Sequence, residues 1–157
     1  MSATYDFTGR VVLITGSSSG IGASTALLFA KSGANVVITG RNADNVSKIA
    51  KQCTDVSPKQ LKALQVIADV TNNEDIDRLV NTTVHTFGKI DILVNIAGIY
   101  NNHKIKDTNY YQKFQEVMKT NLNSVVYLTH KCVEYLAKTK GNVINISSIA
   151  SKLSVNK

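Results

Sequence analysis

The chain has 157 residues, of which 43% are hydrophobic and 18% are charged, a balance that allows one domain with a substantial core and excludes a disordered chain. The formal net charge is +7, but the basic residues are scattered and not interleaved with aromatic residues, which argues against a nucleic-acid partner. No apolar run approaches the roughly 20 residues that span a bilayer. We therefore expect a soluble, cytoplasmic protein with no membrane partner.

An apolar strand, a glycine-rich turn and a helix follow one another from residue 11. Residues 11–14 (VVLI) predict a buried strand, and the residues that follow it, most of them small, are Thr15, Gly16, Ser17, Ser18, Ser19, Gly20, Ile21 and Gly22. Gly16 would permit a tight turn, Gly20 a close approach of the backbone to a phosphate, and Gly22 close packing of the helix. This arrangement is typical of a dinucleotide site, because backbone amides at a helix N-terminus can hold a pyrophosphate.

The rest of the chain alternates strands with helices. The strands are predicted at 35–39, 64–68, 90–96 and 143–147, and the helices at 44–53, 71–87 and 110–136. Thr71 and Glu74 form a capping-box pattern, and Gly141 is expected to close the long last helix. The alternation predicts a doubly wound, Rossmann-like parallel α/β sheet of about five strands with helices on both faces. Residues 1–157 are interpreted as a single dinucleotide-binding domain.

The cysteines and histidines show no metal-ligand pattern. Cys53 and Cys132 lie far apart in helical stretches, and the histidines lack zinc-like spacing to each other or to the cysteines. We expect both thiols to be reduced and mostly buried, and we assign no metal.

Several motifs occur in a fixed order along the chain. The residues that carry this order are Thr15, Gly16, Gly20, Gly22, Asp69, Asn95, Ala97, Gly98, Asn121 and Ser148. In these positions the sequence resembles the short-chain dehydrogenase/reductase family over nearly its whole length, with Ile96 in place of the second Asn of the family pattern. The resemblance implies an NAD(P)-dependent oxidoreductase that interconverts a carbonyl and an alcohol, as a small-molecule substrate, by hydride transfer.

The resemblance also implies roles in cofactor binding. Asp69 would accept a hydrogen bond from the adenine amino group while Val70 covers the ring, although an Asp at a strand end can equally cap a following helix. Asn95, Ala97 and Gly98 would form a floor of small groups beside the ribose and pyrophosphate. The alternative for these three residues is a plain strand exit.

The end of the second strand bears on the choice of cofactor. NAD-dependent dehydrogenases usually place a carboxylate there to hold the ribose hydroxyls, whereas this chain has Gly40 followed by Arg41. A carboxylate repels a 2′-phosphate, and an Arg can hold it through charge-assisted hydrogen bonds of roughly 1.5 to 3 kcal/mol. We predict NADP(H) over NAD(H); the alternative for Arg41 is an exposed turn residue.

Two of the family's catalytic positions are present. Ser148 would hydrogen-bond the substrate oxygen, and Asn121 would help to hold a proton-relay water. The family's Tyr-x-x-x-Lys pair, whose Tyr is the general acid or base, should follow Ser148 beyond the end of this chain. Tyr127 and Lys131 have this spacing but precede Ser148 within a helix, where a pair one turn apart is usually a surface contact.

From this we expect a domain that is incomplete at its C-terminus, the alternative being a natural short form. Either would be weakly active or inactive alone, because a general acid or base contributes about 10² to 10⁴ in rate. The fifth strand would then be an exposed edge, and the long helix would show an unpaired apolar face. The complete protein is expected to be a homo-oligomer. The alternative function is a non-catalytic nucleotide-binding or regulatory protein of the same fold.

Overall fold

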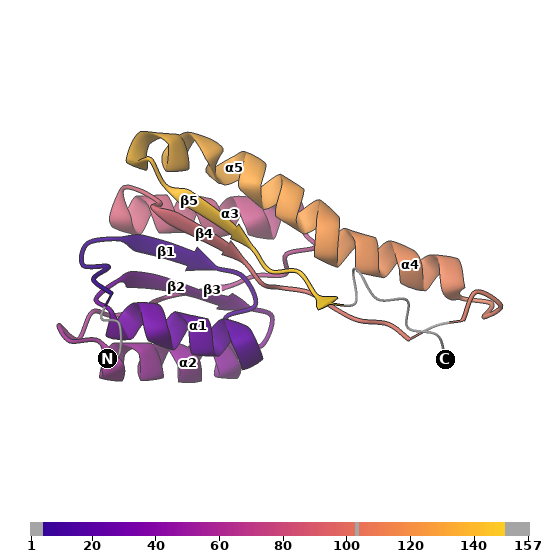
Figure 1. The fold of residues 1–157 in the computed structure, drawn as a ribbon, viewed down its shortest axis with the longest axis horizontal. Helices are drawn as coiled ribbons and strands as arrows, with labels where there is room; N and C mark the ends of the chain where they lie inside the picture. Colours follow the sequence, from indigo (N-terminus) through magenta and orange to yellow (C-terminus); the bar gives the residue numbers. More distant parts are fainter. Residues whose placement is uncertain (1–4, 103, 150–157) are drawn as a thin grey trace.

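A parallel β-sheet forms the framework of the computed structural model, which describes residues 5–102 and 104–149 (Figure 1). The strands within these residues are β1 (Val11–Ile14), β2 (Asn35–Gly40), β3 (Leu64–Ile67), β4 (Ile92–Asn95) and β5 (Asn142–Asn145). They are ordered β3-β2-β1-β4-β5, and all adjacent pairs are parallel. The chain moves outward from β1 in one direction and then from β4 in the other. The predicted doubly wound α/β fold is therefore confirmed.

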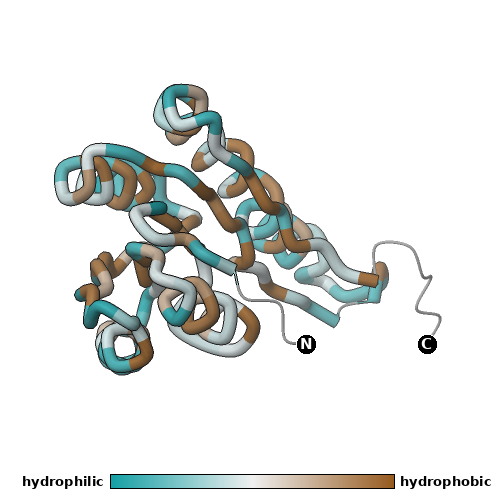
Figure 2. Tube along the Cα trace, turned by 60° about the vertical axis from the view of Figure 1, so that its left-hand side comes forward, coloured by the Kyte–Doolittle hydropathy of each residue, from teal (hydrophilic) through white to brown (hydrophobic). Residues whose placement is uncertain are grey.

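Helices cover both faces of the sheet. α1 (Gly20–Lys31) and α2 (Ala43–Val56) lie on one face, and α3 (Asn73–Phe87) and α5 (Ser124–Thr139) lie on the other (Figure 1). Side chains alternate along β1, so Val12 and Ile14 pack with α1 and α2, whereas Leu13 packs with α3 and α5. Hydrophobic residues accordingly follow the central strands (Figure 2), as expected of a sheet buried on both faces.

The predicted long helix is a continuous rod with a π-helical turn inside it. α4 (Tyr110–Met118) leads into the turn η1 (Lys119–Asn123), and α5 continues from there. Gly141 takes part in closing the rod, because its backbone N–H donates to the carbonyl oxygen of Leu136 at 2.8 Å, but the residue with the left-handed backbone (φ 51°) is Lys140. Gly141 is small for another reason: a Cβ there would lie 2.3 Å from the carbonyl oxygen of Asp91.

The capping-box prediction at α3 is wrong by one residue. Asn72 is the N-cap, and its Oδ1 accepts from the backbone N–H of Asp75 at 2.9 Å. The hydroxyl of Thr71 instead donates to Asp69. Asn is as favourable an N-cap as Thr, so the loop geometry after β3 decides which of the two residues serves.

The two cysteines are free, and the predicted burial of both is confirmed: Cys53 lies in the core on one face of the sheet and Cys132 in the core on the other. Burial raises the pKa of Cys53 to about 11 and that of Cys132 to about 12. Both thiols are therefore protonated at neutral pH and behave as small apolar side chains. No group of three His, Cys, Asp or Glu residues suited to a metal ion occurs within residues 5–102 and 104–149.

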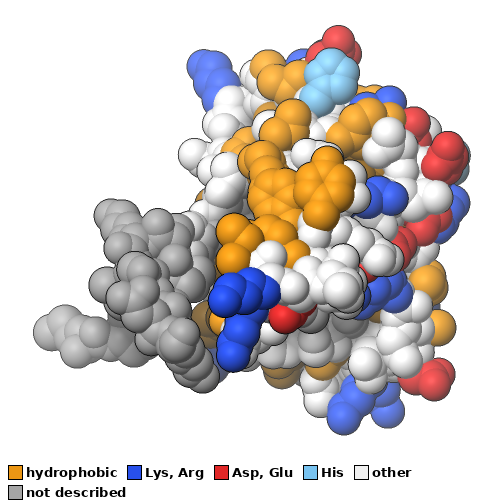
Figure 3. Space-filling model, turned by 90° about the vertical axis from the view of Figure 1, so that its right-hand side faces the viewer, with side chains coloured by type: hydrophobic (Ala, Val, Ile, Leu, Met, Phe, Trp, Pro, Cys, Tyr) orange, Lys and Arg blue, Asp and Glu red, His pale blue; other side chains and the backbone are white. Residues whose placement is uncertain are grey.

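The last strand and the rod present apolar surface to solvent. β5 is exposed along its whole length, and the exposed apolar residues of the rod include Phe114, Leu122, Val126 and Val133. Figure 3 views the molecule from the end toward which α4 projects, and hydrophobic side chains gather there. The expected open edge and uncovered helix face are both observed. In the described part of the chain, no helix combines the length and apolarity needed to cross a membrane.

Candidate dinucleotide-binding site

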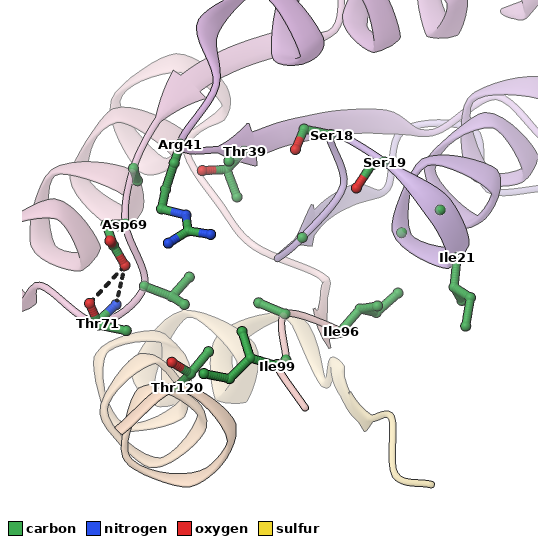
Figure 4. Close-up of a pocket in the computed structure, with 18 of the residues that line it drawn as sticks. Ser18, Ser19, Ile21, Thr39, Arg41, Asp69, Thr71, Ile96, Ile99 and Thr120 are labelled. Atoms are coloured by element: carbon green, nitrogen blue, oxygen red, sulfur yellow. Dashed lines mark hydrogen bonds between the residues drawn. The ribbon is translucent and has the colours of Figure 1, made fainter. Parts of the chain in front are cut away.

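A cleft of about 660 Å³ opens at the carboxyl ends of the strands, between the loops after β1, β2, β3 and β4 and the start of η1 (Figure 4). Its volume falls in the range of small-molecule sites. The predicted site residues that line it are Gly16, Ser18, Ser19, Gly20, Ile21, Gly22, Arg41, Asp69, Val70, Ala97 and Gly98. Four other predicted residues do not line it: Ser17, Asn95, Asn121 and Ser148.

The glycine-rich turn delivers the N-terminus of α1 to this cleft. Gly16 has a positive φ of 65°, and a Cβ there would lie 3.0 Å from Ala97 Cα. A Cβ on Gly22 would lie 2.2 Å from the carbonyl oxygen of Gly16, so Gly22 allows the helix to pack against its own turn. The N-cap Ser19 makes no side-chain capping bond, and the first turn of α1 holds no acidic residue. Its backbone amides are thus suited to an anionic ligand.

Ser17 faces away from the cleft. It is fully buried, its Oγ accepts from the backbone N–H of Thr39 at 2.8 Å, and the same hydroxyl donates to the Thr39 carbonyl oxygen at 3.4 Å. Ser17 therefore joins the turn after β1 to the end of β2. The Ser17 hydroxyl is thus occupied by β2, and Ser17 does not line the cleft. Its role in cofactor binding stays a prediction.

Arg41 forms part of the cleft wall at the end of β2. Its guanidinium extends into the cleft (Figure 4), on the same wall as Ser18 and Thr39. No ion pair to Arg41 is found among the described residues. Thr39 is buried, and its hydroxyl has no hydrogen-bond partner in the described part of the molecule. The wall thus places a cation beside the cavity.

Asp69 and Val70 line the cleft beyond the end of β3. Asp69 Oδ1 accepts from both the backbone N–H and the hydroxyl of Thr71 at 2.8 Å (Figure 4). Asp69 therefore organises its own loop and does not cap α3, whose N-cap is Asn72. The backbone N–H of Asp69 donates to Asp75 Oδ2 at 2.8 Å, which ties the loop after β3 to α3.

Asn95 points to the other side of β4. It is 4% exposed, and its Nδ2 donates to Asn145 Oδ1 at 2.8 Å and to Thr129 Oγ1 at 3.5 Å. The side-chain amide of Asn95 is therefore bound by Asn145 of β5, and Asn95 does not line the cleft. Its place in the floor stays a prediction. The floor consists of the next residues, whose backbone is held by Thr15: its Oγ1 accepts from the N–H groups of Ile96 and Ala97 at 3.0 and 3.1 Å.

Asn121 acts on the cleft through Ile99. Its Oδ1 accepts from the backbone N–H of Ile99 and its Nδ2 donates to the Ile99 carbonyl oxygen, both at 2.8 Å. The side chain projects from η1, and Ile99 itself lines the cleft. π-Helical turns often occur at functional sites. Ser148 follows the last residue of β5 by three positions and is exposed outside the cleft lining.

Replacing Asn121 by Ala is expected to release the loop after β4. Both hydrogen bonds to Ile99 are lost, and a neutral bond contributes about 1 kcal/mol, so the amide of Ile99 should exchange with solvent about fivefold faster or more. Hydrogen exchange read by NMR measures this directly. Asn123→Ala, an exposed position in the same turn, should leave Ile99 unchanged; equal protection in both variants would contradict the clamp.

Tyr127 and Lys131 tie α5 to α3. Tyr127 Oη donates to Asp77 Oδ1 at 3.1 Å, and Lys131 Nζ lies 2.9 Å from the same oxygen. Desolvation and the bond to Asp77 raise the pKa of Tyr127, whereas a tyrosine general acid or base needs a pKa moved toward neutrality. The interpretation of this pair as a surface contact is supported.

The cleft also contains Gly40 and Ile96, which the sequence analysis discussed without predicting them as binding residues, and residues that it missed: Thr39, Ala68, Thr71, Ile99, Glu116, Lys119 and Thr120. Most of these adjoin predicted residues at strand ends. The last three lie on the rod just before Asn121, and their spacing of three and four residues would place them on one helical face. They lie one, two and five residues before Asn121, so helical periodicity counted back from Asn121 does not select them, and only the tertiary structure places them at the cleft.

The sheet is parallel, and its strand order reverses beside the glycine-rich turn. These two features define a Rossmann-like, doubly wound α/β protein. Residues 10–157 match the family model described as short chain dehydrogenase. The chain belongs to the short-chain dehydrogenase family, whose members are generally NAD(P)(H)-using oxidoreductases.

The chain is similar to several curated relatives. It is 37% identical over 144 residues to "11-beta-hydroxysteroid dehydrogenase-like 2" of Arabidopsis thaliana, covering 90% of this chain and 45% of the relative. It is 32% identical over 147 residues to "L-fucose dehydrogenase" of Bos taurus, covering 94% and 52%. The chain thus spans about half the length of the curated relatives it matches.

Two solved structures from Caenorhabditis elegans show the same fold. A glucose dehydrogenase in the apo form has a TM-score of 0.81 and 42% identity, with 92% of this chain and 56% of that one covered. A short-chain dehydrogenase/reductase of unknown function, solved with cofactor, has a TM-score of 0.85 and 39% identity, with 96% and 56% covered.

Proposed function

We propose that this chain is the cofactor-binding part of an NADP(H)-dependent oxidoreductase that interconverts a carbonyl and an alcohol by hydride transfer. The observation that carries the proposal is the cleft in which the uncapped N-terminus of α1 and the guanidinium of Arg41 face one cavity (Figure 4). Family membership supports the reaction class. Arg41 and Gly40 support the choice of the phosphorylated cofactor, because no carboxylate occupies the end of β2.

The residues of the cleft fit the parts of a dinucleotide. The amides at the start of α1 would hold the pyrophosphate, Arg41 the 2′-phosphate, and Asp69 with Val70 the adenine. Ala97 and Gly98 would form the floor beside the ribose. The bound cofactor would supply the hydride acceptor or donor.

Ser148 and Asn121 would act at the reactive end. The backbone N–H of Ile146 donates to the carbonyl oxygen of Asn95 at 3.0 Å, so the loops after β4 and β5 leave the sheet side by side. This supports a role for Ser148 in binding the substrate oxygen near the cleft floor. Asn121 would hold the floor in place through Ile99. Tyr127 is engaged with Asp77, and we assign it no part in proton transfer.

Titration with NADP⁺ and NAD⁺ tests the proposed cofactor. The chain should bind NADP⁺ about ten- to a hundredfold more tightly, the value of one or more charge-assisted hydrogen bonds. Arg41→Asp should remove this preference, because a carboxylate repels the 2′-phosphate. Lys48→Asp makes the same change in charge at an exposed position on α2 outside the cleft, and should preserve the preference. Equal affinity of the unaltered chain for both cofactors would remove the role of Arg41.

A further inference from the structure

Gly40 is constrained by its neighbour Ser18 and not by its own backbone conformation. Its φ is not among the positive values of this chain, so other residues could adopt its conformation. A Cβ on Gly40 would lie 2.3 Å from Ser18 Oγ and 2.9 Å from Ser18 Cβ. On the opposite side it would lie 3.6 Å from Cγ2 of the buried Val46. A side chain at position 40 would therefore be enclosed from two directions.

Neither Ser18 nor Gly40 can easily retreat. Ser17 is bonded to both backbone groups of Thr39, which fixes the chain at Ser18 against the end of β2. The carbonyl oxygen of Gly40 accepts from the N–H of Ala68 at 3.1 Å, and Gly40 pairs with Ile67 across β2 and β3. Rotation of the Ser18 hydroxyl would relieve only the contact with Oγ. The contact with Cβ would persist, because Cβ moves only with the backbone.

We propose that Ser18 is a specificity-determining residue that acts by excluding an acidic side chain from position 40. Such a carboxylate would hold the ribose hydroxyls of NAD(H), so the pair Ser18–Gly40 disfavours that cofactor while Arg41 favours a 2′-phosphate. The cofactor part of this inference rests on the proposed function; the steric part does not. Its consequence is that Gly40→Asp alone cannot create an NAD(H) site, and that only loss of the Ser18 Cβ permits one.

A series of variants tests the pair: Gly40→Asp, and the same change combined with Ser18→Ala or Ser18→Gly, each compared with its position-18 single variant. Without cofactor, Gly40→Asp should lower the thermal midpoint by several degrees. Ser18→Gly should recover most of this loss and Ser18→Ala little, because Ala retains the Cβ. Gly40→Ala, which adds only the Cβ, gives the same comparison should the Asp variant fail to fold.

Calorimetric titration of the same variants with NAD⁺ and NADP⁺ then measures their cofactor specificity. The Ser18→Gly/Gly40→Asp variant should bind NAD⁺ about tenfold more tightly than Gly40→Asp does. An unchanged midpoint in Gly40→Asp, or equal recovery with Ala and Gly at position 18, would overturn the steric inference. Recovery of the midpoint without a gain in NAD⁺ affinity would overturn the role in specificity. Failure of the proposed function shows separately, as a lack of NADP⁺ preference in the unaltered chain.

Discussion

Gly22→Ala is expected to lower dinucleotide affinity by roughly a hundredfold, or about 2.7 kcal/mol. The added Cβ would lie 2.2 Å from the carbonyl oxygen of Gly16, a backbone atom that cannot rotate away. The turn and the helix must separate, and the amides at the start of α1 then lose their alignment. Hydrogen bonds to a charged group contribute about 1.5 to 3 kcal/mol each, so the loss of one or two accounts for the change.

Whether Gly22→Ala raises or lowers the free energy of unfolding shows which of two effects dominates, helix propensity or the contact with Gly16. Helix propensity alone would favour Ala by up to about 1 kcal/mol, whereas forcing a backbone contact apart costs about 1 to 3 kcal/mol. We expect net destabilisation, measured by urea unfolding alongside the cofactor titration. Ser24→Ala, an exposed position on the same helix, should be neutral or slightly stabilising. A stabilised Gly22→Ala variant with full affinity would show that the contact is unimportant.

Asp91→Asn is expected to cost about 2 to 3 kcal/mol of folding stability without changing cofactor affinity. The Asp91 carboxylate is 2% exposed and accepts from the backbone N–H of Val11 at 2.9 Å. It also pairs with Arg10 at 2.8 Å and Lys89 at 3.0 Å. These two cations are 53% and 41% exposed, so they return to water in the variant, which keeps the cost below that of a fully buried broken pair.

The contribution of Asp91 should also depend on pH. Burial acts to raise the pKa of Asp91, but the bonds from Val11, Arg10 and Lys89 outweigh it and hold the pKa below its usual value. The carboxylate therefore contributes stability above the unfolded pKa of about 3.9, and this contribution is lost as the pH falls through the folded pKa. Urea unfolding at several pH values should show a constant difference from Asp91→Asn above about pH 5 and a smaller one toward pH 3.

An exposed aspartate supplies the control for this titration. Asp55→Asn lies on the outside of α2 and should change stability little at any pH in this range. A difference between the unaltered chain and Asp91→Asn that stays the same down to pH 3 would contradict the role assigned to the ionised carboxylate. Asp91 immediately precedes β4 and so lies at the amino ends of the strands, whereas the cleft lies at their carboxyl ends. Loss of cofactor affinity in this variant would therefore also be unexpected.

Local pattern was sufficient for the elements of the fold. Val12, Leu13 and Ile14 form a short apolar run before a glycine turn, and such runs alternate with helical stripes along the chain. The strand order β3-β2-β1-β4-β5 was decided by the tertiary structure, because right-handed crossovers between parallel strands are compatible with other orders. Boundaries and caps were less predictable: Thr71 and Asn72 are both good N-caps, and only the loop after β3 selects Asn72. The π-helical turn at Lys119–Asn123 carries no periodic signal that separates it from the rest of the rod.

The sequence by itself determined that strand ends, a glycine-rich turn and Arg41 meet at one edge of a parallel sheet, because these depend on short-range pattern. The tertiary structure alone decided where individual polar side chains point. Ser17 turns to Thr39, and Asn95 turns to Asn145, 50 residues away. Gly40 is enclosed by Ser18 and Val46. The physical reason is that a buried polar or small residue is fixed by the neighbour that satisfies or crowds it, and that neighbour comes from a distant segment.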